Sequence, residues 1–567
     1  MITGTHKKRM DISNKLAYIV KGEVKADEET LKTYSRDYSI FRVRPQVVIF
    51  PKDEEDIRAV INFVNEHPEE KLTITCRSAG TDMSGGPLNE SIILDFTRHF
   101  NNIKEVVEKD SGNKIAGYAV VEPGVYYRDF EKETLKHNLL FPSYPASKEL
   151  CALGGIVMNN SGGEKSLTYG KTENYVEELR MILRDGNAYT FRKLSKRELE
   201  EKMRMETVEG EIYRKLFDVL KTNDRLLKEA KPKVSKNSAG YYLWNVWDEA
   251  TGEFDIPKLF VGSQGTFGIL TEVKLGLVRP KTHSALLVIF LKDLQVLGKL
   301  VQKVLDQKPE SFESYDDQTM KFALRFLPDF LKLMGAKNMV ALGLQFLPEF
   351  KMLVFGGLPK LILMAEFAAN SQEEAQKRAR EAKEAIKEFK VPMRVTKNQK
   401  ELEKYFSIRR QSFALLHHHA QKLTATAFID DIVVNPEHLP EFLPRLSEAI
   451  KPYSKKMMYT IAGHVGDGNF HIIPLMDLNK KDIRDVIPKL EKKVHELVME
   501  YKGSITGEHN DGLIRTPYLG DMYGREILEL FQKVKEIFDP DYIFNPGKKV
   551  KGDLAYSLAH IAVENET

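Results

Sequence analysis

Three short glycine-rich segments constrain the fold of this chain more than any other feature. They are residues 77–86 (RSAGTDMSGG), 153–163 (LGGIVMNNSGG) and 261–272 (VGSQGTFGILTE). Small residues let backbone N–H groups curl around an anion and let a ligand approach the main chain closely. Neither a Rossmann GxGxxG nor a Walker motif is present. Any one segment alone is more often a plain turn, but three in one chain are hard to explain as turns.

The hydrophobic pattern predicts alternating strands and helices in the first half. We expect a strand at residues 47–50, a helix opened by the acidic run 53–55, and further strands at 72–75, 92–96 and 118–121. A second unit begins near residue 280, with strands at 284–291 and 360–367 and helices at 294–305 and 372–389. This pattern predicts a two-layer α+β domain of βαβ character.

Residues 463–471 (GHVGDGNFH) form the sharpest motif of the C-terminal half. Its two histidines flank a tight Gly/Asp/Asn turn between apolar runs, and such a hairpin can aim both imidazoles at one point. About forty residues later, residues 503–512 (GSITGEHNDG) supply a Glu-His pair. Two histidines and a carboxylate make a competent open metal site. The alternative is two satisfied core histidines and a surface Glu-His pair.

Composition excludes several classes of protein. The 567 residues carry 85 Lys+Arg against 82 Asp+Glu, a balance that gives no electrostatic footprint for nucleic acid. Cys76 and Cys151 are too few for an iron–sulfur cluster or a disulfide framework, so we expect a cytoplasmic protein. No apolar run of secretory length follows the polar N-terminus. Residues 339–367 are the most apolar stretch, but prolines, glycines and charges break it. We expect a core role there, with peripheral membrane contact left open.

The glycine-rich segments, in this order, resemble the flavin-binding fold of the vanillyl-alcohol oxidase and p-cresol methylhydroxylase superfamily. The resemblance implies that residues 40–280 form two subdomains around an extended FAD, with the first segment on the pyrophosphate. Thr81 stands where covalent flavoproteins of this superfamily have histidine, so the FAD is expected to be non-covalent. The implied FAD-binding residues are Ser78, Ala79, Gly80, Thr81, Asp82, Gly154, Gly155, Asn159, Asn160, Gly265, Gly268, Ile269 and Asn545.

The C-terminal motifs, with the ending at 539–548 (DPDYIFNPGK), resemble the FAD-dependent D-2-hydroxyacid dehydrogenases. The resemblance implies that His464, His471 and Glu508 bind a divalent metal, zinc being the first choice, and that His509 is the catalytic base. The segment 405–410 (YFSIRR) is similar to the family's W-x-x-R stretch and makes Arg409 the expected carboxylate clamp, with a surface salt bridge as the alternative.

This chain departs from that family directly after the base. The family usually has glycine next, whereas here Asn510, Asp511 and Gly512 follow. The histidines at 417–419 cannot all face one metal from a helix, and we expect them on a solvated or mixed face.

The expected fold class is α+β. It comprises a two-subdomain p-cresol-methylhydroxylase-type FAD-binding domain, an α+β ferredoxin-like cap domain and a C-terminal helical return to the FAD domain. The expected boundaries are 1–40 for an N-terminal helical lead-in, 41–280 for the FAD-binding domain, 281–505 for the cap and substrate domain, 506–552 for the return segment and 553–567 for the tail.

The expected activity is FAD-dependent oxidation of a D-2-hydroxy acid to the 2-oxo acid. Ile473 is apolar where a polar contact to a second carboxylate could sit, which favours D-lactate or glycolate over D-2-hydroxyglutarate. A sugar or aldonolactone oxidase on the same scaffold and a non-catalytic flavin-binding subunit remain as alternatives. Because the chain offers no second redox centre, we expect an external acceptor: an iron–sulfur subunit, an electron-transfer flavoprotein or a quinone. A homodimer stays open.

Overall fold

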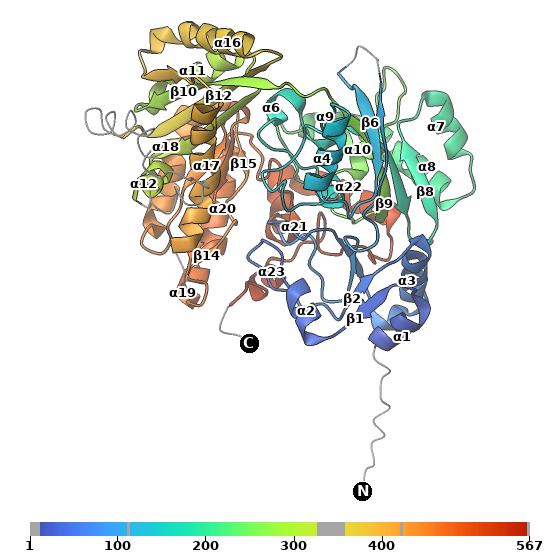
Figure 1. Ribbon diagram of the computed structural model, residues 1–567. Coiled ribbons are helices and arrows are strands. Elements are labelled where there is room, and N and C mark those ends of the chain that lie inside the picture. The colour runs from blue at the N-terminus through green and yellow to red at the C-terminus, as the bar shows by residue number, and fades with distance from the viewer. Residues whose placement is uncertain (1–11, 110–113, 326–357, 420–422, 564–567) are drawn as a thin grey trace.

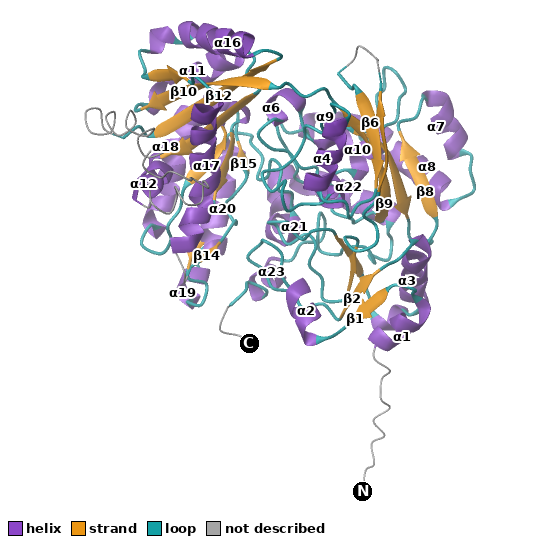
Figure 2. Ribbon diagram, viewed as in Figure 1, coloured by secondary structure: helices purple, strands orange, loops and turns teal. Residues whose placement is uncertain are grey.

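The computed structural model describes residues 12–109, 114–325, 358–419 and 423–563. Its elements form two lobes, one built largely from the first half of the chain and one from residues beyond about 280 (Figure 1). Helices and strands alternate in both lobes, with the sheets lying inside (Figure 2).

The N-terminal part contains a four-stranded mixed sheet with strand order β1-β2-β4-β3. Strands β2 and β3 both run parallel to β4, and β1 pairs antiparallel with β2. Val47 and Ile49 of β2 pack with α3 in one buried cluster, and the Asp53 side chain caps the start of that helix. The elements are α1 (Ile12–Ile19), β1 (Glu23–Lys25), α2 (Glu28–Tyr34), β2 (Val47–Phe50), α3 (Glu54–Glu66), β3 (Ile74–Arg77) and β4 (Ile92–Asp95).

A five-stranded antiparallel sheet follows, with strand order β5-β6-β9-β7-β8. Its central strand β9 begins inside the third glycine-rich segment, so that segment is anchored to the sheet. The elements are β5 (Ile103–Glu108), β6 (Gly117–Val121), α4 (Tyr127–Lys136), α5 (Leu153–Asn159), α6 (Ser166–Tyr169), β7 (Val176–Ile182), β8 (Ala188–Arg192), α7 (Lys196–Met203), α8 (Val208–Thr222), α9 (Asp224–Ala230), α10 (Pro257–Phe260) and β9 (Ile269–Leu277).

The second lobe is built on a seven-stranded antiparallel sheet, ordered β13-β10-β12-β11-β16-β17-β15. Alternate residues of β10 enter two different buried clusters, so helices cover both faces of the sheet. The elements are β10 (His283–Leu291), α11 (Leu297–Leu305), β11 (Ser311–Asp316), α12 (Asp317–Arg325), β12 (Leu361–Ala369), α16 (Gln372–Ala385), β13 (Met393–Val395), α17 (Gln399–His419), β14 (Thr424–Ala425), β15 (Ile432–Val433), α18 (Leu439–Ile450), β16 (Ile461–His464), β17 (Asn469–Ile472), β18 (Leu475–Met476), α19 (Lys481–Arg484) and α20 (Ile487–Glu500).

The C-terminal segment, red in Figure 1, returns to the first lobe and lies among the N-terminal elements. It forms helices α21 (Gly512–Arg515), α22 (Leu519–Phe538) and α23 (Leu554–Ala559). Phe531 and Phe538 of α22 pack in the same buried cluster as β7 and β9. Phe544 forms a parallel bridge with Ile74 of β3. The return segment therefore places residue 544 against β3, the strand that leads into the first glycine-rich segment.

Several sequence predictions are confirmed with small changes in their bounds, among them the strands at 47–50, 92–96, 284–291 and 360–367. One feature differs: segment 1–40, predicted as helical, also supplies strand β1. Residues 153–159 of the second glycine-rich segment form helix α5, which buries Leu153, Ile156 and Val157.

The apolar stretch 339–367 is only partly described. Residues 339–357 lie outside the described residues, and Leu361–Ala369 forms β12, which is almost entirely buried. Across the described part of the chain, the helices are too short or too polar to cross a membrane.

Candidate active site

The two motif histidines project from one β-hairpin, as predicted. Strands β16 and β17 pair antiparallel, with Ala462 opposite His471 and His464 opposite Asn469. This register puts both imidazoles on the same face of the hairpin. Gly468 closes the turn with φ +66°, and a Cβ there would collide with the Val434 carbonyl oxygen at 1.8 Å, so only glycine fits.

Glu508 brings the two imidazoles to one point. Its Oε1 lies 3.2 Å from His464 Nε2 and 3.4 Å from His471 Nε2. The two rings are nearly perpendicular, with centroids 5.2 Å apart. The other carboxylate oxygen, Oε2, accepts a hydrogen bond from Lys236 Nζ at 3.0 Å. Three ligand-type atoms from two separate segments therefore converge.

A carboxylate lies against the second nitrogen of each histidine. Glu313 Oε1 is 2.7 Å from His464 Nδ1, and Asp430 Oδ1 is 3.2 Å from His471 Nδ1. With a metal bound, such partners would fix the tautomer in which Nε2 carries the lone pair, which is the usual outer support of histidines that bind metal. The donor set of His464, His471 and Glu508 therefore fits a divalent metal.

The electrostatics of this cluster follow from its burial and its opposite charges. Burial opposes charge on His471, but Asp430 and Glu508 outweigh that effect and raise the pKa of His471 to about 10. Burial likewise opposes ionisation of Glu508, yet Lys236 and His464 hold its pKa well below the ordinary value. Glu508 is therefore an ionised carboxylate that faces two imidazole nitrogens.

His509 lies beside the cluster and shares the Asp430 carboxylate. Asp430 Oδ2 is 2.8 Å from His509 Nδ1, while Asp430 Oδ1 serves His471. The rings of His509 and His471 stack with centroids 5.0 Å apart. Because its Nδ1 is taken by Asp430, His509 Nε2 is the nitrogen left for proton transfer.

Asp431, the next residue, holds the backbone of the Glu-His segment. Its Oδ2 accepts hydrogen bonds from the main-chain N–H groups of Glu508 and His509, at 2.9 and 2.7 Å, and from the Thr506 hydroxyl. Asp431, His471, Glu508 and His509 also form a group of potential ligands within 4.8 Å of one another. Since Asp431 is engaged by these donors, His464 is the better candidate to join His471 and Glu508 in a ligand set.

Sequence reasoning missed four of these residues: Glu313, Asp430, Asp431 and Lys236. The run 427–434 (AFIDDIVV) did carry a signal, because two consecutive acids inside an apolar stretch are expected to be buried and engaged. Both aspartates are fully buried. Glu313 and Lys236 carry no comparable signal, since each meets the site only through the tertiary fold.

Arg409 lies at the edge of the same cluster. Its Nη2 is 2.5 Å from Glu313 Oε2, and its Nη1 is 3.6 Å from Glu164 Oε1. The guanidinium is almost buried, at 8% exposure, and it reaches His464 through Glu313. The structure thus places the expected carboxylate clamp beside the cluster and in an ion pair. The histidines 417–419 lie in α17, but their side chains are outside the described residues.

The glycine-rich segments meet around Asn545. The Asn545 side chain donates to the carbonyl oxygens of Gly86 and Gln264, at 3.0 and 2.7 Å, and accepts from the Thr75 hydroxyl at 2.8 Å. It therefore joins β3, the first segment and the third segment at one point.

The expected FAD-binding residues divide into two groups. A Cβ built on Gly155 would meet nothing within 4 Å, and one on Gly265 would meet only Cys76 at 4.0 Å. These backbones leave the open space that a close cofactor approach needs, so the segments fit FAD. Gly268 is different, because a Cβ there would meet the Ile182 carbonyl at 2.8 Å, so this glycine serves packing against β7. The remaining expected residues, Ser78, Ala79, Gly80, Thr81, Asp82, Gly154, Asn159, Asn160 and Ile269, lie in the same three segments.

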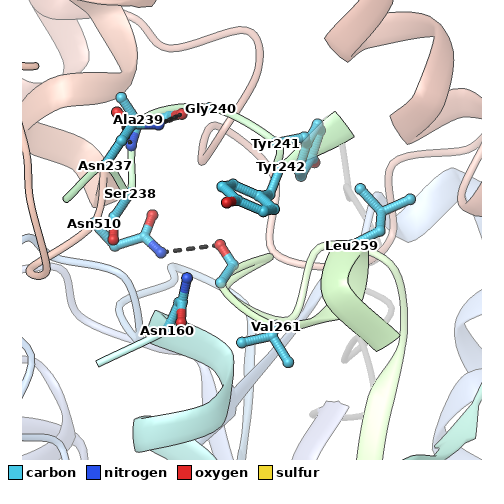
Figure 3. A pocket seen from close by; sticks show the side chains of 11 residues that line it. Asn160, Asn237, Ser238, Ala239, Gly240, Tyr241, Tyr242, Leu259, Val261 and Asn510 are labelled. Atoms are coloured by element: carbon cyan, nitrogen blue, oxygen red, sulfur yellow. Dashed lines mark hydrogen bonds between the residues drawn. The ribbon is translucent and has the colours of Figure 1, made fainter. Parts of the chain in front are cut away.

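A small cavity lies between the second and third segments and the residues that follow His509. Asn160, Tyr242, Val261 and Asn510 face it (Figure 3). The tract 237–240 forms another wall. The second and third glycine-rich segments and the residues after the Glu-His pair thus line one cavity.

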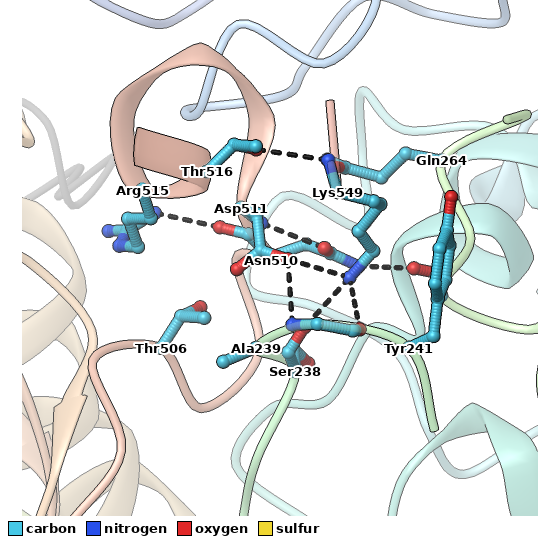
Figure 4. A network of polar contacts seen from close by, with 12 residues as sticks. Ser238, Ala239, Tyr241, Gln264, Thr506, Asn510, Asp511, Arg515, Thr516 and Lys549 are labelled. Carbon is cyan, nitrogen blue, oxygen red and sulfur yellow. Dashed lines mark hydrogen bonds and ion pairs between the residues drawn. The ribbon is translucent and has the colours of Figure 1, made fainter. Parts of the chain in front are cut away.

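A buried polar network lies next to this cavity (Figure 4). Lys549 Nζ is 2.9 Å from Asp511 Oδ2 and also donates to the carbonyl oxygens of Ser238 and Gly240. Gly240 N–H donates to Asp511 Oδ2 as well, at 2.8 Å. The network therefore joins Lys549, in the C-terminal segment, to Asp511, two residues after His509.

Comparison with known proteins agrees with this architecture. Residues 45–192 match the FAD binding domain family, and residues 280–549 match the C-terminal domain of FAD linked oxidases. The chain is 26% identical over 523 residues to glycolate oxidase subunit GlcD of Bacillus subtilis, covering 90% of each protein. It is 25% identical over 533 residues to D-2-hydroxyglutarate dehydrogenase of Pseudomonas putida, covering 93% of this chain and 50% of that protein.

The chain spans about half the length of the first D-2-hydroxyglutarate dehydrogenases that it matches. Its fold is that of p-cresol methylhydroxylase, with a TM-score of 0.64, 13% identity and 96% of each chain covered. The expected fold class is thereby confirmed. The chain therefore carries a match to an FAD binding domain followed by a match to the C-terminal domain of the FAD linked oxidases, on the fold of p-cresol methylhydroxylase.

Proposed function

We propose that this protein is an FAD-dependent dehydrogenase that oxidises a D-2-hydroxy acid to the 2-oxo acid. The observation that carries the proposal is the convergence of His464 Nε2, His471 Nε2 and Glu508 Oε1 beside His509. A sugar or aldonolactone oxidase on this scaffold would not need the two-histidine hairpin. The names of the relatives, D-2-hydroxyglutarate dehydrogenase and glycolate oxidase subunit, support the hydroxy acid class.

His464, His471 and Glu508 would hold the divalent metal, with zinc as the first choice for this set of nitrogen and oxygen ligands. When bound, the metal acidifies the substrate hydroxyl and neutralises developing charge. Three protein ligands leave coordination positions for substrate oxygens. Glu313 and Asp430 keep the two imidazoles turned toward the site.

His509 takes the hydroxyl proton on Nε2. Burial opposes its protonation, while Asp431 and Asp430 raise the pKa of His509. A cation in the adjacent set would act against this effect and favour the neutral base. Asp430 holds Nδ1 at 2.8 Å and so fixes which nitrogen accepts the proton.

The residues proposed to hold FAD are those of the three glycine-rich segments together with Asn545. When bound, FAD supplies the acceptor for the hydride from substrate C2. Thr81 offers no imidazole for attachment, so the FAD is non-covalent. Acid precipitation of the purified protein should leave the flavin in the supernatant, and washed precipitate that stays yellow would refute this assignment.

For the substrate, the proposal favours D-lactate or glycolate. Ile473 lies two residues beyond His471, is half-buried and brings no polar group to a second carboxylate. Arg409 is proposed as the clamp for the first carboxylate, which requires it to share or exchange its ion pair with Glu313. D-2-hydroxyglutarate is the alternative, because several relatives carry that name. A kcat/KM for D-2-hydroxyglutarate well above that for D-lactate would select it.

We propose that the electrons pass from the flavin to an external acceptor, and that the protein is cytoplasmic. Burial raises the pKa of both Cys76 and Cys151 to about 12, so neither thiol is poised for redox chemistry at neutral pH. An iron–sulfur subunit, an electron-transfer flavoprotein or a quinone can serve as acceptor. Reoxidation by a quinone analogue should be fast and reoxidation by oxygen slow, whereas stoichiometric peroxide at full rate would identify an oxidase.

The experiment that tests the proposal is a screen of D- and L-2-hydroxy acids, aldonolactones and sugars with a dye acceptor. We expect turnover with D-2-hydroxy acids alone. Turnover with an aldonolactone would identify the sugar-oxidase alternative. Dye reduction by none of these compounds, in protein that holds both FAD and metal, would support a non-catalytic flavin-binding subunit.

A further inference from the structure

Asn510 replaces the glycine that the resemblance leads us to expect after the catalytic base. Its φ is +70°, a left-handed conformation that glycine adopts freely and that asparagine tolerates better than most residues. The backbone of a glycine is therefore kept, and a side chain is added at a fully buried position. An added amide in such a place must find hydrogen-bond partners.

The Asn510 carboxamide uses all of its hydrogen-bonding groups. Nδ2 donates to the Asn159 carbonyl oxygen at 3.1 Å and to the Gly262 carbonyl oxygen at 2.9 Å. Oδ1 accepts the main-chain N–H of Asp511 at 2.7 Å. Figure 3 shows the Asn510 amide directed at the third segment, with Asn160 of the second segment beside it. One side chain therefore joins the second and third glycine-rich segments.

The main chain of Asn510 is held by Arg515, which also contacts Asp430 of the second lobe. Its carbonyl oxygen accepts a hydrogen bond from Arg515 Nη1 at 2.9 Å, and Arg515 Nη2 donates to the Asp430 carbonyl oxygen at 2.9 Å. Asp430 in turn holds the imidazole of His509. Asn510 thus lies between the support of the base and the segments that fit FAD.

Two main-chain contacts of the residues after Asn510 also reach the glycine-rich segments, but neither makes the contact that the Asn510 amide makes with the second segment. Gly512 N–H donates to Gln264 Oε1 at 2.9 Å, and Leu513 N–H donates to the Ser84 carbonyl oxygen at 2.8 Å. These contacts reach the third and first segments. Among the contacts described for residues 510–513, only the Asn510 amide reaches the second segment.

We propose that Asn510 is a positioning residue that acts through His509: its carboxamide fixes the base relative to the second and third glycine-rich segments and the FAD that they hold. This inference rests on the proposed function for its kinetic consequence, but not for its effect on FAD binding. A residue that served only the left-handed turn would need no amide.

Two substitutions separate the turn from the amide. Asn510→Gly keeps the backbone conformation and removes the amide, which leaves two buried carbonyl oxygens without their donor. Asn510→Asp keeps the side-chain shape but places a carboxylate against those same two oxygens. The matched control is Asn138→Gly, because Asn138 is exposed and also has positive φ, +51°.

The measurements are the FAD dissociation constant of the apoprotein, the limiting rate of flavin reduction in rapid mixing, metal content and the melting temperature. We expect Asn510→Gly to retain metal, to bind FAD about tenfold more weakly and to reduce flavin about tenfold more slowly, since two buried hydrogen bonds are lost. Asn510→Asp should be affected more, and Asn138→Gly should match wild type.

Two results would overturn the inference. One is wild-type FAD affinity and reduction rate in Asn510→Gly. The other is a fall in melting temperature alone, which is what a merely structural role would cause. If the wild-type flavin is reduced by no 2-hydroxy acid, the proposed function fails, and the FAD titration by itself decides the role of Asn510.

Discussion

Asp430 places one carboxylate between two imidazoles, and its role can be tested by removing the charge alone. Asparagine has a single acceptor oxygen, so in Asp430→Asn one of His471 and His509 must face an N–H₂ group and change its tautomer. The base nitrogen is then lost in part of the molecules. We expect flavin reduction to slow by ~10²–10⁴-fold, the range of a lost general base, in rapid-mixing experiments.

The same variant should keep its FAD, because the glycine-rich segments do not contact Asp430 through that carboxylate. Asp317→Asn is the matched control, since Asp317 is partly exposed and its ion pair with Lys321 lies within helix α12. Wild-type reduction rates in Asp430→Asn would show that the carboxylate does not orient the base.

Glu313 lies against the outer nitrogen of His464, one of the proposed metal ligands. Glu313→Gln retains an acceptor for His464 Nδ1 but loses the charge that also pairs with Arg409. Loss of such a support typically weakens metal binding by ~10–100-fold. Titration with a chelator should show this loss at unchanged FAD content, whereas His464→Ala, His471→Ala and Glu508→Ala should each remove the metal. Glu381→Gln, on an exposed helix face, is the control. Wild-type metal affinity in Glu313→Gln would contradict the assignment.

At the scale of single elements, helix α20 makes a contribution to the free energy of unfolding that depends on pH. Glu491 and His495 are buried one turn apart and face Tyr518, whose hydroxyl donates to Glu491 Oε2, and Arg515. Burial raises the pKa of Glu491 to about 8 and lowers the pKa of His495 to about 3. Between pH 6.5 and 8, Glu491 with its pKa of about 8 is largely protonated in the folded chain and ionised in the unfolded chain. His495 is neutral in the folded chain, and the unfolded chain loses its remaining proton on this histidine just above pH 6.5, which only partly offsets the effect of Glu491.

The folded state therefore binds more protons in this window, and its stability falls as pH rises, by at most about 1.4 kcal/mol per pH unit. Glu491→Gln, an uncharged mimic of the protonated acid, should lose this contribution. Denaturation at pH 6.5 and 8.0 measures it as the difference between the two proteins. Glu496→Gln on the exposed face of α20 is the control. An unchanged pH slope in Glu491→Gln would contradict the buried protonated state.

Elements are also where sequence reasoning works best. The hairpin of His464 and His471 follows from a local pattern of apolar runs around a glycine turn, and it folds as predicted. The support of that hairpin is not local: Glu313 lies 151 residues from His464, and Asp430 lies 41 residues from His471. No periodicity records such pairings, because they depend on how β11, β15 and β17 are ordered in the sheet.

Asn510 shows which part of the site the sequence alone does not predict. The sequence shows that glycine is replaced, and the φ of +70° shows that the turn is retained. The partners of its amide, at positions 159 and 262, become visible only when the C-terminal segment packs against the first lobe.

At the scale of the whole molecule, residues 506–516 connect the two lobes. Glu508 and His509 face the hairpin of the second lobe, whereas Asn510, Gly512 and Leu513 bind the three glycine-rich segments of the first. The same short segment thus contacts the proposed metal ligands, contains the proposed base and binds the three glycine-rich segments. This arrangement explains how a site shared between distant parts of the chain keeps one geometry.

The most direct test of the account is anaerobic reduction of the enzyme-bound flavin, followed by its absorbance. D-Lactate or glycolate should bleach the flavin of the metal-loaded protein. After removal of the metal, the flavin should stay bound but remain oxidised, and added zinc should restore the bleaching. Full-rate bleaching in protein shown by elemental analysis to be metal-free, or bleaching by an aldonolactone and by no 2-hydroxy acid, would contradict the account.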